Sequence, residues 1–242
     1  MPNYDVVVYD QKVKDSFIKV TDEKTYLTEI IFAYQAIAES DYLQKCSPES
    51  LRSAIVNIAL TGVTLNPLLH QAYLVPRKGK ACLDISYRGL VKIATDGGGV
   101  LDVDATVVHE KDYFQYEQGL NPILKHIPCL DENPGKPTFV YAKAILPPFP
   151  PGIVKFIVLS AKEIEKVRKT SAAGSGPWLT WEEEMWRKTA VKKLSKLLPL
   201  SDRLALAVSV LNEHEGLESG RKAKEVMNRF ADDEAVKIIG EK

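Results

Sequence analysis

The sequence predicts an α+β protein in which an antiparallel β-hairpin and sheet pack with a long basic helix. Apolar residues recur at helical spacing over residues 25–62 and again after residue 160. Between residues 72 and 159 they occur instead in short runs, several of them alternating, that are separated by turn residues. Residues 176–201 then predict a helix with lysines along one side, which we expect to organise the chain.

The order of patterns predicts three regions. Residues 1–24 are polar and weakly patterned, so we expect an extended or flexible arm. A folded core follows over residues 25–216. Residues 217–242 are mostly charged and predict a C-terminal tail or a helix that docks on a partner.

Two helices and a hairpin open the core. A helix over residues 25–44 has an apolar face formed by Leu27, Ile30, Ile31, Tyr34, Ile37 and Ala38. Ser47 followed by Pro48 predicts the start of a second helix, which ends near Gly62. Residues 72–75 and 81–85 predict a β-hairpin with a basic tip, and a helix over residues 87–96 follows.

The middle of the chain predicts strands over residues 101–108, 113–117, 123–127, 138–146 and 153–159. A proline-rich connection at residues 147–152 cannot join a ladder. Ser160 and Glu163 form a capping box for a helix that ends near Thr170, and residues 171–176 read as a flexible loop. After the long helix, Ser201 and Asp202 cap a last helix over residues 203–215.

The long helix has two interpretations. Thr180 and Glu183 match a capping box, and Pro199 marks the end. At about 100° per residue, Lys188, Lys192 and Lys196 form a row opposite the apolar arc. Like charges at this spacing repel one another, so a repeating negative partner such as a phosphate backbone would relieve the row. The alternative is an ordinary solvated face with aromatic residues in the core.

The net charge is zero over 242 residues, but positive charge is concentrated in two blocks. Residues 51–100 carry +4 and residues 151–200 carry +5. The other segments are negative: residues 1–50 carry −4, residues 101–150 carry −3 and residues 201–242 carry −2. Such asymmetry can give a neutral protein a basic stripe. No secretion signal or membrane-spanning run is evident, and the three cysteines are scattered, so we expect a cytoplasmic protein.

Each basic block carries a motif made of several short runs. One motif is the run Gln71–Pro76 followed by Ile85–Leu90. The second is Ser175–Trp178, then Glu184-Met185, Lys188-Thr189 and Leu198–Ser201. In order and spacing, over roughly residues 50–215, these motifs resemble those of the RecT family of phage and prophage single-strand annealing proteins. This sequence departs from the family pattern at Lys192 and Lys193, where arginines are expected, and in its proline-rich connection.

The resemblance implies that residues 25–216 form an annealing-protein core for DNA binding and oligomerisation, with a DNA groove between the sheet side and the long helix. It implies ATP-independent binding of single-stranded DNA and of the annealed duplex, by a homo-oligomer that forms a ring or helical filament. A cognate exonuclease or a host single-strand-binding protein is a further expected partner. The candidate DNA-binding residues are the cations and aromatics of the two blocks: Arg77, Lys78, Lys80, Tyr87, Arg88, Lys92, Trp178, Lys188, Lys192, Lys193 and Lys196. Tyr73 and Trp181 also stand beside these cations, and Trp178 has the alternative of anchoring the loop before the helix.

Other functions are less well supported by the residues. No Gly-x-x-x-x-Gly-Lys-Ser/Thr pattern occurs, which fits action without ATP. The sequence has no Glu-x-Lys motif, and its four histidines lack ligand spacing, so we expect no catalytic or metal site and no cofactor. A metal-dependent nuclease is therefore disfavoured. A strand-coating protein that does not anneal, or a scaffold for an acidic partner, remains as an alternative.

Overall fold

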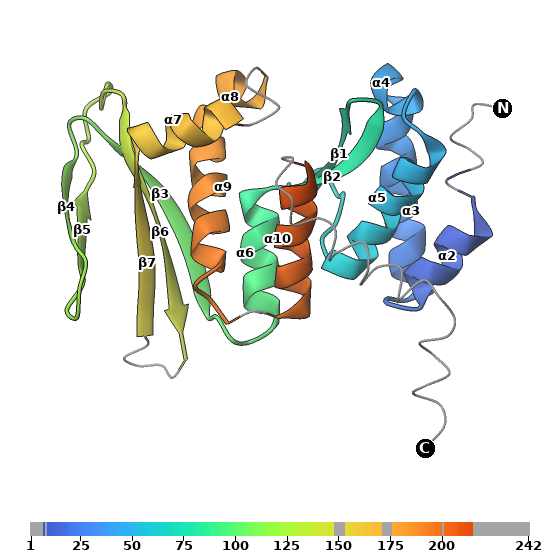
Figure 1. Cartoon of the computed structure of the whole chain (residues 1–242), viewed down its shortest axis with the longest axis horizontal. Coiled ribbons are helices and arrows are strands. Elements are labelled where there is room, and N and C mark those ends of the chain that lie inside the picture. Colours follow the sequence, from blue (N-terminus) through green and yellow to red (C-terminus); the bar gives the residue numbers. More distant parts are fainter. Residues whose placement is uncertain (1–6, 8, 148–152, 171–175, 200, 215–242) are drawn as a thin grey trace. The chain divides into compact units, whose positions relative to one another are not determined.

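The computed structural model of the chain describes residues 7, 9–147, 153–170, 176–199 and 201–214 (Figure 1). The chain forms two compact units, each described here by itself. Unit 1 combines residues 1–93 with residues 201–242, and unit 2 comprises residues 94–200. The core predicted over residues 25–216 therefore contributes to both units. The tail predicted over residues 217–242, the loop 171–175 and most of the proline-rich connection lie outside the described residues.

The first helix described in unit 1 lies within the segment predicted as an extended or flexible arm, so over residues 11–18 that prediction is wrong. Helix α2 spans Gln11–Ile18, with the Asp10 side chain accepting a hydrogen bond from the backbone N–H of Lys12. Val13 and Phe17 lie one helical turn apart and are both buried. These two apolar residues at i, i+4 spacing are enough to dock a short helix in a polar segment.

Among the residues of this unit that the structure describes, four further helices lie wholly within it: α3 (Glu23–Ala38), α4 (Asp41–Gln44), α5 (Pro48–Thr61) and α10 (Asp202–His214). The predicted caps of α5 are confirmed, because the Ser47 side chain accepts from Ser50 N and Gly62 is left-handed with φ 71°. The Ser201 hydroxyl caps α10 by accepting from Leu204 N.

The buried face of α3 differs from the predicted one. Ile30 and Ile37 are buried as predicted, but Leu27 and Ile31 are exposed. The reason is a buried carboxylate: Glu29 accepts hydrogen bonds from the Thr64 hydroxyl and, at 2.8 Å, from Leu65 N. A buried carboxylate needs such partners, so the side of α3 that carries it faces the loop after α5.

The predicted hairpin is confirmed. Strands β1 (Ala72–Arg77) and β2 (Lys80–Ile85) pair in antiparallel register. Lys78 and Gly79 form the two-residue turn with φ of 50° and 74°, which matches the twist of a hairpin. Helix α6 (Tyr87–Asp96) follows and begins at Ser86, whose hydroxyl accepts from Gly89 N.

Unit 2 is built on a three-stranded antiparallel sheet with strand order β3-β6-β7 (Figure 1). The strands are β3 (Asp102–His109), β6 (Pro137–Leu146) and β7 (Ile153–Ser160). Helix α9 (Glu182–Ser195) packs against all three strands. A second hairpin, β4 (Tyr113–Glu117) with β5 (Ile123–Ile127), contacts β6 through Phe114, whose ring stacks on Tyr141 at 5.9 Å between centroids.

The helices that precede and include α9 confirm one predicted capping box and overturn another. In α7 (Ala161–Thr170), Ser160 N donates to the Glu163 carboxylate at 3.0 Å and Glu163 N donates to the Ser160 hydroxyl. The long helix predicted from Thr180 is instead two helices, α8 (Pro177–Thr180) and α9. Trp181 leaves helical geometry between them (φ −131°, ψ 47°), so Thr180 ends α8 and no side chain caps α9. Among the described helices, none is long and apolar enough to cross a membrane.

Candidate nucleic-acid interface

The predicted DNA-binding residues fall into two sets, one in each unit. The hairpin set comprises Arg77, Lys78 and Lys80 of the β1–β2 hairpin together with Tyr87, Arg88 and Lys92 of α6. The α9 set comprises Trp178, Lys188, Lys192, Lys193 and Lys196. Unit 1 carries the first set and unit 2 the second.

The hairpin tip exposes two of its three cations. Lys78 and Lys80 are exposed on either side of Gly79. Arg77 lies half-buried, and its guanidinium contacts Asp84 Oδ1 at 3.3 Å across the hairpin. The tip is held in place because Gly79 O accepts from Ser47 N and the Ser50 hydroxyl accepts from Ala81 N. The two lysines therefore project from an anchored turn.

Helix α6 directly follows β2 in the chain and carries the remaining three residues of the hairpin set. Arg88 is exposed, with its Nε 3.5 Å from the Tyr87 hydroxyl, whereas Tyr87 and Lys92 are half-buried. Gly89 allows this helix to approach β1 closely, since a Cβ there would lie 2.3 Å from the backbone oxygen of Gln71. The glycine in the Tyr-Arg-Gly-Leu motif thus serves packing and fixes where Arg88 projects.

The lysine row on α9 is not continuously exposed. Lys196 is exposed and Lys192 is half-buried, but only 9% of Lys188 is exposed. Lys193 is exposed and lies 3.7 Å from the Glu163 carboxylate of α7. The cations open to a ligand therefore gather at the C-terminal end of α9.

The resemblance implied a DNA groove between the sheet side and the long helix. Among the described residues, no such groove separates α9 from the sheet of unit 2. Ala190, Val191 and Leu194 of α9 are buried, as are Val103 of β3 and Ala142 of β6. These apolar side chains fill the interface because α9 packs directly on the strands. A ligand of α9 would have to use its exposed side, which carries Trp181 at one end and Lys196 at the other.

The tryptophans also separate into two environments. Trp178 is only 2% exposed, which fits its alternative as an anchor of the turn before α9, and Trp186 is buried as expected. Trp181 is 65% exposed at the junction of α8 and α9. Of these three rings, Trp181 is the one able to stack on a base without rearrangement.

Ordinary helix electrostatics accounts for part of the charge on α9. Its first turn holds Glu182, Glu183 and Glu184, and its last turn holds Lys192 and Lys193, as the helix dipole favours. Arg187 forms structural ion pairs, with Glu183 at 3.0 Å and Glu184 at 2.5 Å. The charge pattern of α9 alone therefore does not require DNA.

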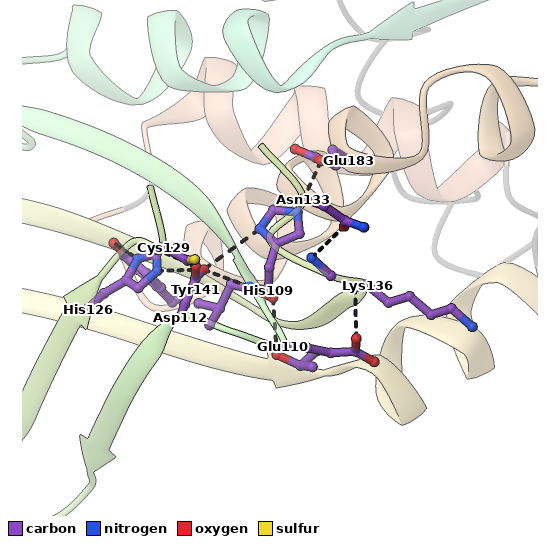
Figure 2. A network of polar contacts seen from close by, with 12 residues as sticks. His109, Glu110, Asp112, His126, Cys129, Asn133, Lys136, Tyr141 and Glu183 are labelled. Atoms are coloured by element: carbon purple, nitrogen blue, oxygen red, sulfur yellow. Dashed lines mark hydrogen bonds and ion pairs between the residues drawn. The ribbon is translucent and has the colours of Figure 1, made fainter. Parts of the chain in front are cut away.

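A buried polar network in unit 2 was not predicted (Figure 2). Asp112 Oδ2 accepts from His109 N at 2.7 Å and from His126 Nε2 at 3.0 Å, and Asp112 Oδ1 accepts from Cys129 N at 2.8 Å. The other ring nitrogen of His126 lies 3.3 Å from the Tyr141 hydroxyl. His109 Nε2 in turn lies 3.3 Å from Glu183 of α9.

The network ties the β4–β5 hairpin to the sheet. Burial raises the pKa of Asp112, but the hydrogen bonds from Cys129, His109 and His126 outweigh it and lower the pKa to about 2. Asp112 therefore holds a charge that fixes its neighbours. Across the described ranges no group of three or more His, Cys, Asp or Glu side chains is arranged to hold a metal ion.

Comparisons with known proteins agree on one family. The model of the RecT family matches residues 28–227. Protein RecT of Escherichia coli (strain K12) is 40% identical over 178 residues, which cover 69% of this chain and 64% of that protein. The uncharacterized protein YqaK of Bacillus subtilis (strain 168) is 26% identical over 167 residues, 69% of this chain and 57% of that protein. The chain thus matches less than two thirds of the length of each of these relatives.

Proposed function

The chain belongs to the RecT family, and we propose that it binds single-stranded DNA and anneals complementary strands in phage-type homologous recombination. In this proposal it acts without ATP, as an oligomer that assembles on DNA. The observation that carries the proposal is that both basic blocks carry exposed cations, at the anchored hairpin tip, at the start of α6 and at the end of α9.

Annealing requires a first strand to be held by its backbone, with the base edges left open to a second strand. Contacts that ignore sequence meet this requirement, and charge and stacking provide them. Lys78, Lys80 and Arg88 are the proposed phosphate ligands of unit 1. Lys192, Lys193 and Lys196 are the proposed ligands of unit 2, with Trp181 as the stacking platform.

Oligomerisation follows from the size of the protomer. One protomer of 242 residues covers only a few nucleotides, so pairing of long strands needs many protomers in line. When the complementary strand arrives, it brings a second set of phosphates to the same cations. The duplex intermediate should therefore stabilise the assembly. A cognate exonuclease that produces the single strand, or a host protein that coats it, is the class of partner that this activity implies.

The test separates annealing from simple coating. The protein is mixed with one oligonucleotide, and then either its complement or an unrelated strand is added, with and without ATP. We expect faster pairing and larger assemblies only with the complement, and equally in both ATP conditions. A requirement for ATP would contradict the proposal, and so would an assembly that the complement leaves unchanged. The second result would favour a strand-coating protein.

Nuclease activity and scaffolding are checked beside it. Incubation of labelled DNA with magnesium and the protein should leave the DNA intact, because fragmentation would reveal a nuclease. A polyacidic peptide should fail to compete with the oligonucleotide, because equal binding would favour a scaffold for acidic partners.

A further inference from the structure

Two exposed apolar surfaces of unit 1 have no role in the proposed DNA contacts. The first is on α3, where Leu27 and Ile31 are 51% and 55% exposed; we name this pair the α3 stripe. The second is in the loop between α5 and β1, where Leu68 is 82% exposed and Leu69 is 48% exposed; we name this pair the leucine knob. Adjacent exposed apolar residues of this kind mark contact surfaces more often than isolated ones do.

The leucine knob is presented by a well-bonded loop. The Asn66 side chain accepts from Leu68 N at 3.0 Å, and Asn66 O accepts from Leu69 N at 3.1 Å. At the start of the loop, the Thr64 hydroxyl accepts from Asn66 N. At its end, the Ser86 hydroxyl donates to His70 O at 2.6 Å. A loop fixed at both ends shows its leucines in one conformation, which lowers the entropy that binding must remove.

The loop that carries the leucine knob begins on the side of α3 opposite the α3 stripe. Glu29 holds the start of the knob loop through Thr64 and Leu65. Glu29 is two residues from Leu27 and two from Ile31, so its side chain projects about 160° away from each of them around the helix axis. The stripe and the knob are both exposed in the same copy, so neither covers the other there.

The charges around the two surfaces are complementary. Glu23, Leu27, Ile31, Gln35 and Glu39 follow one another at i, i+4 spacing, and all five are exposed, so the stripe has a carboxylate at each end. Glu23 also contacts Lys14, which leaves Glu39 as the stronger source of negative charge. Beside the knob lies the start of α6, which exposes Arg88. On a larger scale, residues 1–50 carry −4 and residues 51–100 carry +4.

We propose that the leucine knob of one copy docks on the α3 stripe of the next copy, so that protomers join head to tail through unit 1. A contact between two different surfaces is heterologous, and it propagates as a ring or an open filament. This inference rests on the proposed function only for the idea that DNA promotes assembly. It names the surfaces that make the oligomer.

The experiment uses two full-length variants, each of which disables one surface. The stripe variant is Leu27→Lys with Ile31→Gln; the lysine can pair with Glu23 one turn away, so the helix is preserved. The knob variant is Leu68→Glu with Leu69→Gln. The control is Leu120→Glu, which changes a fully exposed leucine of the β4–β5 hairpin in unit 2. Sedimentation velocity measures assembly with and without an oligonucleotide, and thermal melting checks the fold.

Each variant alone should need about tenfold to hundredfold more protein for assembly than the unmodified chain, because each loses buried leucine or isoleucine contact. An equimolar mixture of the two should form a 1:1 complex that does not grow, since one intact knob meets one intact stripe. The control should assemble like the unmodified chain. Should a double substitution lower the melting temperature, Ile31→Gln alone and Leu69→Gln alone replace it and should show the same pattern in weaker form.

Normal assembly of both variants would overturn the proposal. So would an unmodified chain that stays monomeric with and without DNA. A stripe variant that melts earlier but assembles normally would show that the stripe is covered by its own chain, and would also overturn it. If the unmodified chain assembles through these surfaces but does not anneal strands, the proposed function fails and this inference stands. If the unmodified chain anneals strands as an oligomer while both variants still assemble, the proposed function stands and this inference fails.

Discussion

The carboxylate of Asp112 accepts a hydrogen bond from Nε2 of His126 at 3.0 Å, and side-chain exposure is only 3% and 6%, respectively. The same carboxylate accepts two backbone N–H bonds, from His109 and Cys129. One charged group therefore joins the end of β3, the start of β4 and the segment after β5. Hydrogen bonds are stronger where water is excluded, so these buried contacts should contribute measurably to the stability of unit 2.

Asp112→Asn should lower the free energy of unfolding by about 3 kcal/mol at pH 7, since it removes the charge from a buried hydrogen-bonded group. Chemical denaturation measures this. Asp131→Asn is the control. Asp131 is exposed and forms a long ion pair with Lys111, at 3.8 Å, so its substitution should change the free energy of unfolding by less than about 0.5 kcal/mol. Equal effects of the two substitutions would show that the network is not a stabilising element.

The pH dependence of unfolding gives a second prediction for the same residue. The pKa of Asp112 is lowered to about 2 in the folded protein, so its contribution to stability is complete above the ordinary pKa near 3.8. That contribution is lost as the pH falls through the folded pKa, and it amounts to about 2 kcal/mol. The difference in unfolding free energy between the unmodified chain and Asp112→Asn should therefore shrink between about pH 5 and pH 2. A difference that stays constant over this range would contradict the assignment.

Local elements of the fold were predicted well from the sequence. The caps at Ser47 and Ser160, the hairpin over residues 72–85 and the strands of unit 2 depend on neighbouring residues, which periodicity and capping patterns detect. The predicted capping box at Thr180 failed because Trp181 interrupts the helix. That break is a matter of backbone geometry, and the Thr-x-x-Glu pattern does not report it.

The sequence could not show which of the candidate site residues are exposed, because burial depends on long-range packing. Periodicity placed Lys188 with Lys192 and Lys196, since all three share one helical face. It could not show that the middle of that face is covered. Nor could it find the Asp112 network, whose partners at His126 and Cys129 are 14 and 17 residues away.

Gly89→Ala should destabilise unit 1 by about 3 kcal/mol. A Cβ at this position would lie 2.3 Å from the Gln71 backbone oxygen and 2.7 Å from the Ile85 side chain, so α6 would have to move. Gly99→Ala is the matched control, because its Cβ would meet Pro199 at an ordinary 3.5 Å. Thermal melting compares the two. A similar small effect of both would show that α6 is not tightly packed on β1.

The two ends of the lysine row should respond differently to salt. Affinity for a single strand falls linearly with salt on a log–log plot, by about 0.7 per phosphate engaged. Lys196→Met should lower this slope by about that amount, because Lys196 is exposed. Lys188→Met should leave the slope unchanged, because Lys188 is 9% exposed. Fluorescence anisotropy of a labelled oligonucleotide over a salt series measures both, and a reduced slope for the Lys188 variant would place that lysine on the DNA.

The exposed ring of Trp181 should stack on bases, whereas the buried ring of Trp178 should not. Trp181→Ala should weaken binding of a single strand by about 1–3 kcal/mol, the range for one base stacked on an aromatic side chain. This loss should persist at high salt, because stacking does not depend on counterion release.

Trp178→Phe keeps an apolar ring in the buried position and should leave the affinity unchanged. Its indole Nε1 has no hydrogen-bond partner among the described residues, so little else is lost. Titration with an unlabelled oligonucleotide, followed by tryptophan fluorescence, provides the readout. Quenching that persists in Trp181→Phe and disappears in Trp178→Phe would reverse the assignment and make Trp178 the DNA-facing ring.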